Sequence, residues 1–75
     1  KNIVIFPNPS NGIVNILNNS EIKIKNIRVI NLLGQTLQEN KFQKEIDISK
    51  LPIGVYYINF EKKDGKSFNY KIIKK

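Results

Sequence analysis

The 75-residue sequence contains no cysteine, histidine, methionine or tryptophan, and it also lacks alanine. Without cysteine the chain can form no disulfide and offers no thiolate to a metal ion. Without histidine it lacks the commonest general base and the commonest zinc ligand. The absence of alanine and methionine disfavours helices. The composition therefore predicts a protein with no cofactor and no bound metal, stabilised by an apolar core.

Long apolar runs are also missing, so we expect no direct membrane insertion. The sequence begins Lys1-Asn2, without an initiator methionine and without the pattern of a signal peptide. The length fits one domain, residues 1–75. Together these features predict a piece of a longer secreted protein, whose secretion signal would lie upstream.

The charge is one-sided, with 13 basic and six acidic residues and a formal net charge of +7. Such a balance can indicate a nucleic-acid partner or simply a soluble surface. Arg28 is the sole arginine, whereas base and phosphate recognition relies on the planar arginine fork. We therefore expect no nucleic-acid partner, and a charge-driven nucleic-acid binder stays as a lesser alternative. We also expect a monomer.

Isoleucine, valine and aromatic residues alternate with polar ones through most of the chain, which predicts strands. About seven short strands, separated by turn residues and with no helix, predict a small antiparallel two-sheet sandwich of immunoglobulin-like type. The expected strands span residues 2–6, 13–17, 22–29, 35–38, 45–48, 55–61 and 67–73.

Local signals refine this outline. The apolar phase slips at Lys25-Asn26, which predicts a bulge or a bend. Gly34 is expected at positive φ in a hairpin turn. The Asp-Gly pair of residues 62–66 predicts a type I′ hairpin turn, and the polar segment 39–43 predicts a loop.

Four segments stand in a characteristic order. They are Phe6-Pro7-Asn8-Pro9-Ser10-Asn11-Gly12, then residues 29–37 (VINLLGQTL), then residues 46–56 (IDISKLPIGVY), and last residues 70–75 (YKIIKK). This series closely resembles the type A C-terminal sorting domain of the type IX secretion system, over essentially the whole chain. The family commonly has tyrosine where this chain has Phe6, and aspartate where it has Asn31.

The resemblance implies a non-catalytic export signal. A cargo protein would reach the periplasm of a Gram-negative bacterium, and the folded domain would dock on the outer-membrane type IX translocon and its shuttle proteins. A sortase-like surface enzyme would then remove the domain. The cargo would end at the outer-membrane surface or be secreted.

The candidate recognition residues each have a structural interpretation beside the functional one. Prolines end a strand, glycines serve turns, a tyrosine fills the core or bonds its hydroxyl at a sheet corner, and lysines protect an edge strand. The resemblance adds recognition by the export machinery. The candidates are Pro7, Asn8, Pro9, Gly12, Gly34, Gly54, Tyr56, Lys71, Ile72, Ile73, Lys74 and Lys75.

Catalytic chemistry is not expected. Glu45 and Asp47 lie on one strand face without a partner acid, and Ser49 has no histidine anywhere in the chain. The remaining alternative is an accessory sandwich that binds carbohydrate or a surface, or acts as a spacer. Tyr57 and Phe42 are the candidate exposed aromatics for such a platform.

Overall fold

The computed structural model describes residues 3–75 and contains seven strands and no helix in that range. The expected first strand began at Asn2, which lies outside the described residues. The strands are β1 (Ile3–Phe6), β2 (Ile13–Asn18), β3 (Ile24–Ile30), β4 (Thr36–Lys41), β5 (Glu45–Asp47), β6 (Gly54–Lys62) and β7 (Ser67–Lys74).

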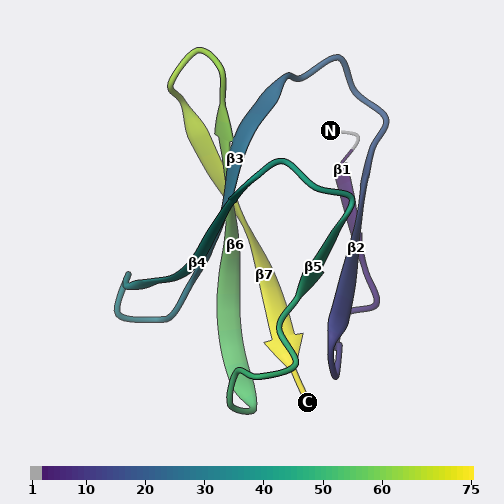
Figure 1. The fold of residues 1–75 in the computed structure, drawn as a ribbon, viewed down its shortest axis with the longest axis vertical. Coiled ribbons are helices and arrows are strands. Elements are labelled where there is room, and N and C mark those ends of the chain that lie inside the picture. Colours follow the sequence, from purple (N-terminus) through teal and green to yellow (C-terminus); the bar gives the residue numbers. More distant parts are fainter. Residues whose placement is uncertain (1–2) are drawn as a thin grey trace.

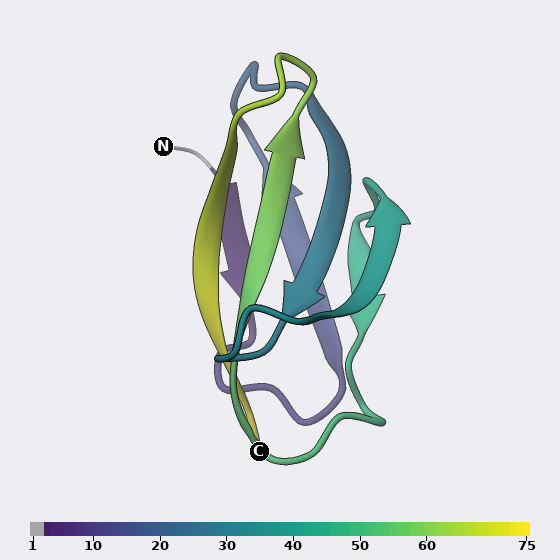
Figure 2. The ribbon, with the colours of Figure 1, turned by 90° about the vertical axis from the view of Figure 1, so that its left-hand side faces the viewer.

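The strands form two antiparallel sheets, with orders β1-β2-β5 and β4-β3-β6-β7. Figures 1 and 2 show the two sheets packed against each other as layers. The described part of the chain measures 32 × 23 × 18 Å. The sequence-based prediction of an all-β, two-sheet sandwich is confirmed.

The core lies between the sheets because alternate residues of each strand face inward. In β6, for example, Tyr56, Ile58 and Phe60 are buried, and their neighbours are partly exposed. The buried apolar residues are Ile3, Val14, Ile16, Ile24, Ile27, Val29, Ile46, Ile48, Tyr56, Ile58, Phe60 and Ile72. Isoleucine dominates this set, and its stiff branched side chain suits a pleated sheet.

An aromatic cluster closes the core beside the β6–β7 hairpin. The Phe60 and Phe68 rings stack with centroids 5.4 Å apart, and Tyr70 meets both rings edge-on. These offset and edge-to-face arrangements are the ones that ring quadrupoles favour. The expected placement of Phe68, Tyr70 and Ile72 on one face of the last strand is confirmed.

Two local predictions are also confirmed. The pairing of β3 with β6 shifts register between Ile24 and Asn26, at the expected bulge. Gly34 has φ +84°, a conformation that costs residues with a Cβ about 1–2 kcal/mol.

Two other predictions are wrong. Residues 39–41 were expected in a loop, but β4 continues through Lys41 because β3 offers it a pairing partner. A polar sequence suits such an edge strand, which needs no apolar alternation. The hairpin at residues 62–66 is not type I′, since Gly65 has φ +92° and Asp64 does not have positive φ. Gly65 N–H donates to the Lys62 carbonyl, so a type I turn is followed by a glycine bulge.

Candidate recognition surface

The β1–β2 loop, residues 7–12, leaves the first sheet where Pro7 ends β1. Proline cannot donate a ladder hydrogen bond, so β1 stops at Phe6. The peptide bonds before Pro7 and Pro9 are both cis. The loop then crosses to the other sheet and lies along the free edge of β7 near the C-terminal end of the chain.

Asn8 makes the first contact with that edge. Its side-chain Nδ2 donates to the carbonyl oxygen of Lys71 at 3.0 Å, and its Oδ1 accepts the N–H of Ile73 at 3.0 Å. One amide side chain thus offers a donor and an acceptor to the edge, as the backbone of a neighbouring strand would.

Ser10 continues the contact with its own backbone. Its N–H donates to the Ile73 carbonyl at 2.8 Å, and its carbonyl accepts the N–H of Lys75 at 2.9 Å. Ser10 thereby pairs with Lys74 in a short parallel bridge. The serine is 1% exposed, and its hydroxyl donates to the Ile13 carbonyl. We call the Asn8 side chain and the Ser10 backbone the clamp.

The loop before β6, residues 48–53, lies at the same end of the sandwich. The hydroxyl of Tyr56 donates to the Pro52 carbonyl at 2.6 Å, and the ring fills the core, as expected for a tyrosine at a sheet corner. The Ile48 N–H donates to the carbonyl of Gly12, which ties this loop to the β1–β2 loop. Gly54 has φ +157°, at the limit of the region that other residues rarely adopt. Gly12 has no positive φ, and an added Cβ would make only ordinary contact with Ser49.

The C-terminal residues alternate between the two faces of β7. Lys71, Ile73 and Lys75 are exposed, whereas Ile72 is fully buried. Lys74 is only 8% exposed, and its Nζ donates to the carbonyl of Lys75 at 3.2 Å. The Lys74 ammonium group therefore points toward the backbone of the next residue. An inward-pointing lysine is also a known protection for an edge strand.

The turn between β3 and β4 lies at this end too, but apart from the clamp (Figure 1). Asn31 Oδ1 accepts the N–H groups of Leu33 and Gln35, both at 2.9 Å, so its side chain holds the turn from within. The turn holds Leu32 and Leu33 in solvent, at 67% and 83% exposure. Sequence reasoning placed only Gly34 among the candidates and missed these two leucines.

The candidate residues therefore fall into groups. The structure joins the β1–β2 loop, the loop before β6 and the end of β7 through direct hydrogen bonds, and it leaves Gly34 outside this network. Three segments far apart in the sequence thus meet at one end of the sandwich (Figures 1 and 2).

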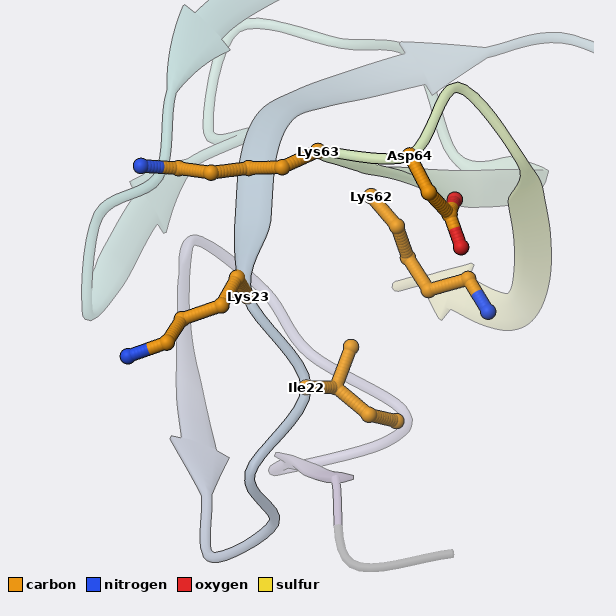
Figure 3. Close-up of a pocket in the computed structure, with 5 residues that line it drawn as sticks. All are labelled: Ile22, Lys23, Lys62, Lys63 and Asp64. Carbon is orange, nitrogen blue, oxygen red and sulfur yellow. The ribbon is translucent and has the colours of Figure 1, made fainter.

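A depression of about 350 Å³ lies at the opposite end, lined by Ile22, Lys23, Lys62, Lys63 and Asp64. The amino groups of Lys23 and Lys63 point to one side in Figure 3, and that of Lys62 points to the other. Because these ammonium groups do not converge, the depression lacks the geometry of an anion site.

The single arginine is engaged within the outer face of the larger sheet. Arg28 forms ion pairs with Glu39 at 3.0 Å and Glu61 at 3.2 Å. Hydrogen bonding from Asn26, and secondarily from Arg28, lowers the pKa of Glu61. The arginine fork is thus occupied by carboxylates, which counts against phosphate recognition.

The acidic and aromatic side chains bear on metal binding and on a carbohydrate-binding platform. A hydrogen bond from Ser49 lowers the pKa of Asp47. Within residues 3–75, no group of three or more His, Cys, Asp or Glu side chains could hold a metal ion. Tyr57 and Phe42, the two candidate exposed aromatics, are each only partly exposed, and Phe42 packs against the core. Phe6, which sequence reasoning did not consider for this role, is 46% exposed.

The comparison with known families decides the assignment. Residues 4–75 match the family described as secretion system C-terminal sorting domain. The chain belongs to this family. No curated protein is significantly similar to the chain.

As a member of the type IX secretion C-terminal sorting domains, the protein is a sorting signal for secretion. Its cargo is a secreted or cell-surface protein, and the sorting domain interacts with the type IX secretion system. None of the residues that the structure describes forms a helix with the length and hydrophobicity needed to cross a bilayer.

Proposed function

We propose that residues 1–75 are a single sorting domain at the C-terminal end of a longer protein, which directs that protein through the outer-membrane type IX translocon and has no catalysis of its own. The cargo crosses the periplasm of a Gram-negative bacterium, and the domain docks on the translocon and its shuttle proteins. A sortase-like enzyme then removes the domain at the cell surface. The family match over residues 4–75 carries this proposal.

The recognition surface we propose is the end of the sandwich where the candidate motifs meet. The clamp connects the Pro-Asn-Pro segment to the last residues of β7, and Gly12 connects it to the loop before β6. The exposed Lys71 and Lys75 add positive charge there. A surface built by residues from three separate segments supports recognition of a folded domain, because only folding brings them together.

A fusion experiment tests the function. A reporter with an N-terminal secretory signal is joined to residues 1–75 and produced in a bacterium that has the type IX machinery. We expect the reporter at the cell surface or in the medium, without the sorting domain. The same reporter without residues 1–75, and the fusion in a strain without the translocon, should remain periplasmic. A fusion that stays periplasmic while an established sorting domain exports the reporter would contradict the proposal.

A further inference from the structure

The clamp occupies a defined part of the edge of β7. In an antiparallel edge strand, alternate residues direct both N–H and C=O away from the sheet. Ile73 does so, and by the same alternation Lys71 and Lys75 do so too. The clamp bonds four of these groups: the Lys71 carbonyl, the Ile73 N–H, the Ile73 carbonyl and the Lys75 N–H. From Lys71 to Lys75, this edge is therefore already paired.

A paired edge limits how a partner can bind these residues. An added strand needs unpaired backbone groups, and the clamp has taken those groups. A partner instead meets the side chains of Lys71, Ile73 and Lys75, which stand on the outer face roughly 7 Å apart. Ile73 lies beside Val55, and Lys71 lies beside Tyr57, so each is supported by a neighbour on β6.

We propose that the secretion machinery binds the end of β7 as a folded, clamped strand, and that Asn8 is the positioning residue that holds this strand in its binding conformation. The inference rests on the proposed function and specifies how the signal is read. The matching partner surface is acidic at two points on either side of an apolar contact. Asn8 acts through β7 and need not touch the partner.

Binding of the last residues as an extended peptide would make the opposite prediction for export. If the partner bound the last residues as an extended peptide drawn out of the sheet, the two Asn8 hydrogen bonds would have to break first. Weakening the clamp would then leave export unchanged or improve it. If the partner binds the clamped strand, weakening the clamp lowers export. A fall in export therefore indicates binding of the clamped strand, whereas unchanged or increased export indicates binding of an extended peptide.

The test uses Asn8→Ala in the reporter fusion. We expect the amide hydrogens of Ile73 and Lys75 to exchange about tenfold faster, since Ile73 loses a hydrogen bond and Lys75 lies in the same clamped segment, while the core amides of β6 change little. We expect the exported fraction of the reporter to fall several-fold. Asn11→Ala, in the same loop and exposed, is the matched control and should export normally.

Ile46→Val controls for stability, because Ile46 is buried on β5, away from the clamp. This variant should lower the melting temperature and leave the Asn8 contacts in place. Normal export of the Ile46→Val fusion, together with reduced export of the Asn8→Ala fusion, supports the positioning role of Asn8. The proposal is overturned if both variants lose export equally. It is also overturned if Asn8→Ala exports normally although the Ile73 amide exchanges faster.

Two further measurements apply if Asn8→Ala does not fold. Asn8→Asp keeps the acceptor for the Ile73 N–H but cannot donate to the Lys71 carbonyl, and it should lower export to an intermediate level. A synthetic peptide of residues 67–75 should fail to displace the intact domain from outer membranes that contain the translocon. A peptide that competes as well as the intact domain, or native export in Asn8→Asp, overturns the inference. Failure of the native fusion to export contradicts the proposed function instead.

Discussion

The hydroxyl of Tyr56 donates a 2.6 Å hydrogen bond to the carbonyl oxygen of Pro52, four residues earlier in the chain. The bond spans the corner where the loop before β6 turns into the sheet, and Tyr56 as a whole is 6% exposed. The same side chain therefore packs in the core and fixes the loop above it.

Tyr56→Phe should keep the ring packing and remove only this bond. We expect the free energy of unfolding to fall by about 1 kcal/mol, measured by urea denaturation. Tyr57→Phe, at a partly exposed position on the same strand, is the matched control and should change stability by less than about 0.5 kcal/mol. A Tyr56→Phe domain as stable as the native one would mean that the corner bond contributes nothing.

Asn31 should determine the stability of the turn between β3 and β4. Asn31→Ala removes the acceptor for two backbone N–H groups, and we expect a loss of about 1–2 kcal/mol. Asn31→Asp keeps that acceptor and loses only the exposed bond from Asn31 Nδ2 to Gln35 Oε1, so its stability should stay near the native value. Aspartate is also the residue that is common in the family at this position. Thermal unfolding of both variants, with Asn19→Ala as an exposed control, checks this. Equal losses in the two Asn31 variants would contradict the expectation.

Because the core is small, a cavity in it should cost a large share of the stability of the domain. Ile58 is completely buried in the central strand β6, so Ile58→Ala should cost about 2–5 kcal/mol. A 75-residue domain has a total stability of roughly 4–11 kcal/mol, so the variant should be partly or wholly unfolded at 37 °C. Circular dichroism during heating measures this. Ile53→Ala, at a position 80% exposed, should melt like the native domain.

Glu61 should make stability depend on pH. Its pKa is lowered below the ordinary 4.5 in the folded state, so it binds a proton more readily when unfolded. The stabilisation is present above the ordinary pKa and is lost as pH falls through the folded pKa. The stability difference between native and Glu61→Gln should therefore be largest near neutral pH and should shrink below about pH 4.5. Glu21→Gln, at an exposed position, should not show this pattern, and a pH-independent difference for Glu61→Gln would contradict it.

Local chemistry explains which features could be predicted from the sequence. Gly34, the bulge after Ile24 and the Tyr56 corner each depend on residues a few positions apart, so their signals are visible in the chain. β4 was only partly found, because an edge strand with polar side chains carries no apolar period. Hydrogen-bonded pairing with β3 holds this segment as a strand instead.

The clamp could not be predicted in the same way. Asn8 bonds residues 63 and 65 positions away, and nothing in the Pro-Asn-Pro segment indicates which distant edge it will meet. Likewise, alternation along β7 predicts that Ile72 faces inward. The same alternation turns Lys74 inward, but its pairing with Ser10 on one side and Gly54 on the other follows only from the tertiary fold.

The end of β7 has a consequence for experiments that shorten the protein. Ile72 belongs to the core, and Ile73 and Lys75 hold the β1–β2 loop. Deleting the last four residues would remove a hydrophobic side chain from the interior and release the first loop, so it would damage the architecture of the whole domain. Replacing Lys75 alone would change one surface charge. Truncation and point substitution at this strand are therefore not equivalent perturbations, and only the second isolates the part played by charge.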